Sequence, residues 1–351
     1  MTNAIKIFLP AAVSFVVGIL LTPLATHYFY KYRMWRRVAR TTNVAPEGDF
    51  NKIHDGKSEL STPRTGGMIV WMSVVVTIFI FGCIHFIFQN TLSDKLYFMS
   101  RSQTVLPFFA LVVASLVGLG DDFLQIFGTG KWLTDPLVLR YIKIGIIVVL
   151  GAVIGQWFFF KLGISAVYVP WYGFVDLGYF FIPFFILIML GVFSSSVIDG
   201  LDGLSGGVIA SIFMSFTLIA FFKNQIDLAT FCAVVTGATL AFLWFNIPPA
   251  RFYMGETGMI GLTVTISVVA FLTNTVLLLP VIAFPLFITS LSSIIQILSR
   301  KYRNGKKVFR VAPFHHHLEA IGWPKYTVTM RYWIVGILSA IIGVIFSILS
   351  S

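Results

Sequence analysis

Two pairs of aspartates in this sequence have spacings that suit metal or phosphate chemistry. Asp121 and Asp122 are adjacent, so on a helix their side chains point about 100° apart and cannot act as equivalent ligands. Asp199 and Asp202 lie three residues apart, which places both carboxylates on one face of any helical turn. Gly200 lets a ligand approach the backbone between them. Solvated helix ends would explain the first pair equally well, whereas a plain glycine-rich turn needs no second aspartate.

Histidines, a glutamate and a lysine add proton-transfer and charge-pairing groups. His315, His316 and His317 are adjacent, so a regular backbone cannot easily turn all three toward one ion. We expect proton transfer or phosphate binding from them, with a solvated polar loop as the alternative. Glu256 stands at an expected helix start, where it would also favour the helix dipole. Lys143 lies inside an apolar segment and must find an anionic partner or extend its ammonium group to the membrane surface.

Together these groups suit phosphoryl transfer. A hard cation such as Mg²⁺ takes oxygen ligands from carboxylates and from substrate phosphates. Phosphoryl transfer needs such an ion, positioned charge and little covalent chemistry from the protein. A pyrophosphate-containing donor that meets a lipid phosphate at a membrane surface therefore fits the inventory. A further segment, 62–67, is by itself typical only of a turn with helix-cap chemistry.

The elements that must position these residues are membrane-spanning helices. The chain has 351 residues, of which 57% are hydrophobic and only 11% charged, whereas soluble domains are usually about 25% charged. A span needs about 20 mostly apolar residues. We therefore predict one all-α membrane domain over residues 1–351, with a tight turn at 273–275 between the eighth and ninth spans. The ten predicted spans are 5–30, 67–90, 104–120, 140–160, 178–197, 203–222, 229–246, 257–273, 276–298 and 331–350.

The loops between these spans differ in charge. Of the 25 Lys and Arg residues, 20 lie in or beside the loops 31–66, 121–139, 198–202, 247–256 and 299–330, and 5 lie on the other side. Because Lys and Arg concentrate in cytoplasmic loops, we predict that the first set is cytoplasmic and that both termini are outside. Every polar segment falls in this set. Topology therefore explains most of the net charge of +11, and we expect no nucleic-acid partner.

Two smaller features fit a membrane protein. Cys83 and Cys232 lie in apolar stretches, which favours buried thiols over a disulfide or a metal site. A basic cluster follows the first span, and we expect it to touch anionic membrane lipid headgroups. The cluster consists of Lys31, Arg33, Arg36, Arg37 and Arg40.

The polar segments also match a known family. The chain resembles the polyprenyl-phosphate N-acetylhexosamine-1-phosphate transferase superfamily, and within it the phospho-MurNAc-pentapeptide transferase (MraY) branch. The resemblance covers nearly the whole chain and includes the ten-span count. The segment with three histidines, Glu319 and a later Gly322-Trp323 pair is its most specific part. The other matching segments are Thr62-Pro63…Gly66-Gly67, Gly120-Asp121-Asp122, Asp199-Gly-Leu-Asp202-Gly-Leu204 and Phe245-Asn246…Met254-Gly255.

The resemblance implies a reaction at the bacterial inner membrane. UDP-MurNAc-pentapeptide and undecaprenyl phosphate would give lipid I and UMP with Mg²⁺, and relatives suggest a homodimer. Asp121 and Asp122 would serve the lipid phosphate and its deprotonation, and Lys143 matches a lysine of the fourth span. The remaining implied roles are His315, His316 and His317 on the phosphates, Glu256 and Asp199 on the metal, Asp202 and Asn246 on uridine, Tyr253 stacked on uracil, and Gly200 and Leu201 in the substrate-binding segment.

The sequence departs from the family pattern in ways that keep alternatives open. The family's metal-site aspartate is Glu256 here, an asparagine before the Asp199 segment is Ser196, and a lysine after Asp122 is Gln125. A WecA-like enzyme that transfers an N-acetylhexosamine 1-phosphate is the first alternative. A secondary transporter is a remote one, because its charged groups would lie near the bilayer midplane and its halves would repeat. Direct attack by the lipid phosphate and a two-step route through a phospho-enzyme both remain possible.

Overall fold

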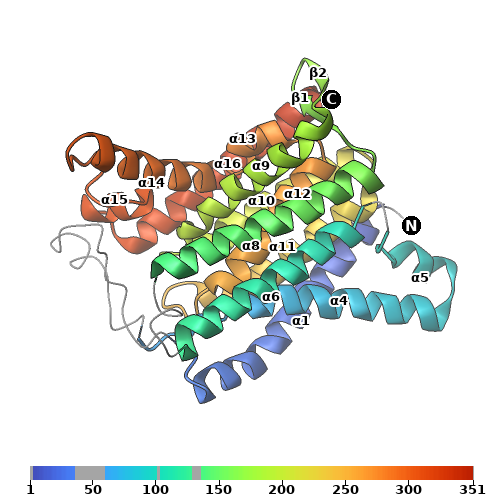
Figure 1. Ribbon diagram of the computed structural model, residues 1–351. Coiled ribbons are helices and arrows are strands. Elements are labelled where there is room, and N and C mark those ends of the chain that lie inside the picture. Colours follow the sequence, from blue (N-terminus) through green and yellow to red (C-terminus); the bar gives the residue numbers. More distant parts are fainter. Residues whose placement is uncertain (1–2, 36–59, 101–102, 129–135, 351) are drawn as a thin grey trace.

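The computed structural model describes residues 3–35, 60–100, 103–128 and 136–350, and Arg36, Arg37 and Arg40 of the basic cluster lie outside them (Figure 1). Within these ranges, nine helices are long and apolar enough to cross a membrane, or ten spans if one bent pair counts as a span. This confirms the all-α membrane class. The nine are α1 (Asn3–Lys31), α4 (Gly67–Phe88), α6 (Val105–Phe127), α8 (Pro136–Gln156, continued by a π-helical turn to Lys161), α9 (Phe181–Ser194, extended by 3-10 turns to a span of Gly178–Ile198), α10 (Leu204–Phe222), α11 (Ile226–Asn246), α12 (Gly255–Leu272) and α16 (Lys325–Leu349).

The centre of the bundle is α12. Nearly every one of its residues is buried, and it packs along α6 and also contacts α4, α9 and α10. A helix that packs against neighbours on every side needs no polar face toward solvent, and α12 accordingly has none. Its first turn therefore meets several other helices at one end of the bundle.

The predicted ninth span is broken, which corrects the prediction of a single helix over 276–298. A 3-10 turn (Val276–Leu278) and α13 (Leu279–Ile282) are followed by α14 (Phe284–Tyr302) at an angle of 90°. Pro285 stands in the first turn of α14, where a proline begins a helix well but cannot continue one from before. The predicted tight turn at 273–275 is confirmed, because α12 ends at Leu272 and the 3-10 turn begins at Val276.

Two other helix bounds differ from the predictions. The third span was expected to end at residue 120, but α6 continues to Phe127, so Asp121 and Asp122 are helical and buried rather than part of a loop. The last helix begins at Lys325 instead of 331. Short apolar stretches set the predicted bounds, whereas packing against neighbouring helices keeps polar residues helical beyond them. The loop before α16 also holds a short helix, α15 (Phe314–Ala320).

The two ends of the bundle carry different structures. A two-stranded antiparallel hairpin, β1 (Ala166–Val169) with β2 (Gly173–Asp176), lies between α8 and α9, in a segment expected to be a loop. We call this the hairpin end, which also holds the short helix α5 (Thr91–Leu96) and the C-terminus (Figure 1). The opposite end, where α6 ends, α12 begins and α15 lies, is the motif end. The predicted polar segments meet there.

Candidate active site

Two aspartates hold the start of α12. Asp122 Oδ1 accepts the Glu256 N–H at 3.1 Å, and Asp122 Oδ2 accepts the Thr257 N–H at 2.9 Å. Asp199 Oδ2 accepts the Gly255 N–H at 3.1 Å. The first N–H groups of a helix have no partner within it, and carboxylates there also interact favourably with the helix dipole. We call Asp122 and Asp199 the anchor pair, because each binds the backbone of α12 from another segment.

The carboxylate of Asp121, the residue before Asp122, has different partners. Lys143 Nζ, on α8, lies 3.0 Å from Glu256 Oε1 and 3.3 Å from Asp121 Oδ2. Lys143 therefore has the anionic partner that its position in an apolar segment demanded. Gln125, which replaces a lysine of the family pattern, donates from its amide to Asp121 Oδ2. We call Asp121, Lys143 and Glu256 the lysine cluster. Its three side chains are mostly buried, so their charges interact more strongly than they would in water.

The three histidines of α15 have separate surroundings, as their adjacency predicts. His315 is fully buried, and neither ring nitrogen has a hydrogen-bond partner among the described residues. His316 Nδ1 lies 2.6 Å from Glu319 Oε2, and His317 Nδ1 accepts the Arg310 N–H at 3.2 Å. The α15 helix packs on the Asp199 segment, since a Cβ on Gly200 would lie 2.8 Å from His315 Nε2.

Burial sets the charge of two of these histidines. It lowers the pKa of His315 well below its ordinary value, and the nearby His316 lowers it further. Burial also lowers the pKa of His317, with a smaller contribution from Arg310. Both imidazoles are therefore neutral at neutral pH, when a neutral ring can donate one hydrogen bond and accept another.

The residues predicted to contact uridine cross-link the loops around the site. Asn246 is 1% exposed, its Oδ1 accepts the Gly203 N–H at 3.0 Å, and its amide donates to Phe252 O at 2.8 Å. Asp202 Oδ2 accepts the Ala250 N–H at 3.1 Å. The amide of Asn246 thus positions two loops, while direct uridine contacts of Asp202 and Asn246 stay predictions. The same holds for half-buried Tyr253 and for Leu201, which is buried in the core.

Sequence reasoning missed one charged residue of the site. Arg64, in the segment 62–67, is 5% exposed, and its charge attracts Asp122. The segment pairs with the loop before α12 through the Tyr253 N–H to Pro63 O and the Gly67 N–H to Met254 O, each at 2.8 Å. The sequence did offer one signal, because Arg64 is the one charged residue between positions 60 and 84. Its position in the sequence, however, predicted no partner for its side chain.

The donor chemistry of the site fits Mg²⁺. Asp121 and Glu256 direct carboxylate oxygens at one point, the Lys143 ammonium, and Mg²⁺ prefers such oxygens. Within the described residues, no three His, Cys, Asp or Glu side chains form a ready metal cage. The side chains therefore fit an ion held by one or two carboxylates together with substrate phosphates, the usual arrangement for Mg²⁺ in phosphoryl transfer.

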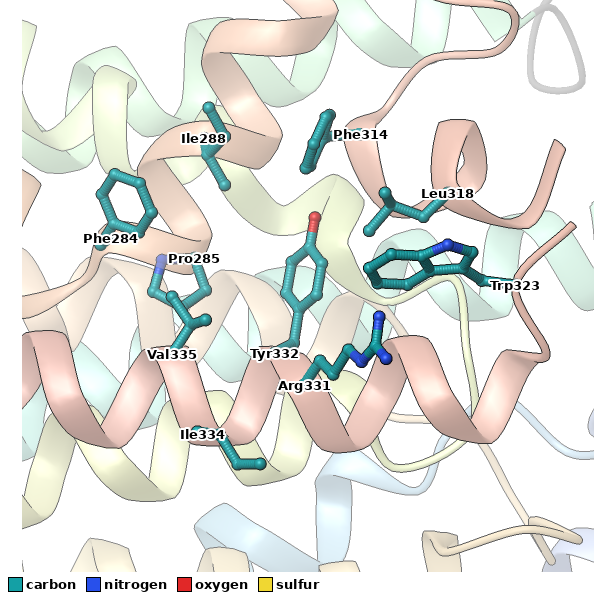
Figure 2. Close-up of a pocket in the computed structure, with 10 residues that line it drawn as sticks. All are labelled: Phe284, Pro285, Ile288, Phe314, Leu318, Trp323, Arg331, Tyr332, Ile334 and Val335. Carbon is teal, nitrogen blue, oxygen red and sulfur yellow. The ribbon is translucent and has the colours of Figure 1, made fainter. Parts of the chain in front are cut away.

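An apolar pocket of about 500 Å³ adjoins the histidines between α14, α15 and α16. Figure 2 shows Phe284 and Pro285 at one end and Trp323 with Arg331 at the other. The Arg331 guanidinium lies 4.0 Å from the centre of the Trp323 ring. Tyr332, which also lines the pocket, has its ring 6.3 Å from that of His315. The pocket thus places a mostly apolar wall beside the polar site.

Comparison with known proteins agrees with this arrangement. Residues 104–274 match the model of glycosyl transferase family 4. The chain is 32% identical over 334 residues to the phospho-N-acetylmuramoyl-pentapeptide-transferase of Geobacillus sp. (strain WCH70), covering 94% of each chain. It is 33% identical to the protein of that name from Geobacillus thermodenitrificans (strain NG80-2), covering 96% of this chain and 97% of the relative. For the Listeria innocua protein of that name the identity is 31%, covering 95% of each chain.

Proposed function

The chain belongs to the phospho-N-acetylmuramoyl-pentapeptide-transferase family, and on that premise we propose that it transfers phospho-MurNAc-pentapeptide from UDP-MurNAc-pentapeptide to undecaprenyl phosphate. The products are lipid I and UMP, in peptidoglycan synthesis. The lysine cluster is the observation that carries the proposal. It sets one cation between two carboxylates at the start of the central helix, where positioned charge is what phosphoryl transfer needs.

The transfer is one displacement at phosphorus. An oxygen of the lipid phosphate forms a bond to the β-phosphorus of the donor, and the bond from that phosphorus to the bridging oxygen of UMP breaks. Bound Mg²⁺ would neutralise charge on the diphosphate, with Glu256 and Asp121 holding it. Asp199, also predicted to bind the metal, accepts the Gly255 N–H and the Ser205 hydroxyl, so in this proposal it supports the site through the start of α12. Lys143 keeps Asp121 and Glu256 side by side and offers its ammonium group to the phosphates.

The geometry favours different roles for the two adjacent aspartates. Both oxygens of Asp122 already accept backbone N–H groups of α12, so protonating Asp122 would weaken the anchor of that helix. A phosphate monoester is mostly ionised at pH 7 and needs little help from a base. We therefore assign Asp121 to orienting Lys143 and the reacting phosphate, and Asp122 to holding the site together.

The apolar pocket suits the acceptor. An isoprenoid chain is wholly apolar, and the pocket between α14 and α16 opens beside α15, whose histidines are the predicted phosphate-supporting residues. In this proposal the motif end faces the cytoplasm, where a soluble nucleotide donor is available, and the membrane is the bacterial inner membrane. The charge asymmetry of the loops supports that orientation.

The test is release of UMP by the purified protein in detergent. We expect release with UDP-MurNAc-pentapeptide and undecaprenyl phosphate together, loss of release when Mg²⁺ is chelated, and none with UDP-N-acetylglucosamine. Release with UDP-N-acetylglucosamine alone would favour the WecA-like alternative. Exchange of labelled UMP into the donor without acceptor would indicate the two-step route. No release with either donor would overturn the proposed function.

A further inference from the structure

Arg64 is a buried cation that makes no ion pair among the described residues. Its side chain is 5% exposed, and its Nη1 is buried without a hydrogen-bond partner. A buried guanidinium nitrogen that lacks a hydrogen-bond partner carries a desolvation cost of about 1–3 kcal/mol or more. The other buried or half-buried cation of the site, Lys143, has two carboxylates in contact. The long-range attraction of Asp122 therefore leaves the Nη1 donor of Arg64 without a hydrogen-bond acceptor.

The backbone holds Arg64 in register with the start of α12. Its N–H donates to Met34 O at 2.9 Å, and its carbonyl oxygen packs so closely on Gly255 that a Cβ there would lie 1.8 Å from it. Gly255 has φ +68°, a conformation that also favours glycine. The N–H of Gly66 donates to Tyr253 O at 2.9 Å, which closes the same contact from the other side. Arg64 is thus as firmly placed as the anchor pair.

Asp122 attracts this cation without using its hydrogen-bond donors. The charge of Arg64 stabilises the Asp122 carboxylate, yet the two side chains form no direct ion pair. The Asp122 oxygens accept the N–H groups of Glu256 and Thr257 instead. The Nη1 donor of Arg64, which is buried without a hydrogen-bond partner, therefore remains for another anion.

We propose that Arg64 binds a phosphate group of a substrate and forms, with Lys143, an anion subsite at the start of α12. This inference rests on the proposed transfer reaction. A guanidinium group matches two phosphate oxygens at once, with charge-assisted hydrogen bonds that a lysine cannot reproduce in the same plane. The diphosphate of the soluble donor and the monophosphate of the lipid acceptor both offer this chemistry.

Ligand titrations with the purified full chain in detergent test the subsite. The variants are Arg64→Met and Arg64→Lys, and the probes are uridine, UMP, UDP and a short isoprenyl monophosphate. We expect Arg64→Met to weaken UDP binding about tenfold or more while uridine binding stays unchanged, and Arg64→Lys to lie between. Weaker binding of the isoprenyl monophosphate, with UDP unaffected, would assign the subsite to the acceptor.

Arg303→Met is the matched control, because it removes the same charge from an exposed position just after α14. Unchanged affinities for UDP and for the isoprenyl monophosphate in Arg64→Met would overturn the inference. So would loss of the folded state in both Arg64 variants, which would make Arg64 a structural cation. Failure of the wild-type protein to release UMP would instead overturn the proposed function, whatever the titrations give.

Discussion

The anchor pair and the lysine cluster meet at the same turn of α12 but bind different parts of it. Asp122 and Asp199 accept hydrogen bonds from backbone N–H groups, whereas Asp121 and Glu256 contact the side chain of Lys143. The backbone N–H groups at the start of α12 are fixed in place, and their carboxylate partners hold that turn against other segments. Side-chain partners can exchange an ammonium group for a metal ion or a phosphate. The difference teaches that carboxylates in one cluster divide into those that build the site and those that act in it.

The sharpest contrast is between neighbours in the sequence. Asp121 and Asp122 point away from each other on α6, one toward α8 and the other toward the start of α12. Gly118, one turn earlier, allows the second contact, because a Cβ there would lie 2.2 Å from Glu256 O. The close approach of α6 and α12 therefore decides which aspartate becomes an anchor.

The largest effect on activity is expected from Lys143→Met, which leaves two carboxylates without their shared cation. We expect kcat/KM for UMP release to fall about 100- to 1000-fold, the usual result of removing a charge positioned for the transition state. The folded protein should persist, since methionine fills similar space. The control is Lys161→Met, at the other end of the same helical segment. Activity within a few fold of wild type would remove the lysine cluster from the mechanism.

A large effect on stability is expected from Asp122→Ala. It removes both acceptors of the α12 N–H groups and the charge that offsets buried Arg64, and we expect the unfolding free energy to fall by about 3 kcal/mol. Thermal unfolding in detergent would show this as a Tm lower by about 4 °C. Asp121→Ala, one residue away, should lower Tm much less but reduce UMP release. Equal Tm losses in the two variants would erase the distinction between anchor and cluster.

His315 is buried and neutral at neutral pH, so it should make the stability of the folded protein depend on pH. Its pKa in the folded protein lies below the ordinary value near 6.5, so below that pH the unfolded chain binds a proton that the folded protein does not. Stability is therefore unaffected above pH 6.5 and falls as the pH drops, by about 1.4 kcal/mol per pH unit from this group. Thermal unfolding between pH 7.5 and 5 measures it. His315→Phe should flatten the profile, and an unchanged acid slope in that variant would contradict the assignment.

The smallest effect is expected from Glu256→Asp, which installs the residue of the family pattern. The carboxylate retreats by one methylene from Lys143, now at 3.0 Å, so we expect a loss of about 1 kcal/mol of interaction and a change in activity of about fivefold. The concentration of Mg²⁺ that gives half-maximal UMP release should shift with it. Glu256→Gln keeps the length but removes the charge, and it should lose far more activity. A larger loss in Glu256→Asp than in Glu256→Gln would show instead that side-chain length outweighs charge.

Much of the site could be predicted because its residues are polar in an apolar chain. The segments around Asp121, Asp199, Glu256 and His315 stand out by composition alone, and the structure brings them together at the motif end. Arg64 could not be predicted in the same way. Its partner Asp122 is distant in the sequence, and the segment around it has the composition of an ordinary turn.

The sequence by itself determined the membrane class, the approximate positions of most spans and the gathering of polar segments at one end of the bundle, because apolar length and charge are local properties of a chain. Only the tertiary structure decided that Asp122 anchors α12, that Asp121 shares Lys143 with Glu256, and that α14 turns by 90° from α13. These outcomes depend on which face of one helix meets another. That choice follows from packing between segments more than 100 residues apart, such as Asp122 and Thr257, and no local pattern records it.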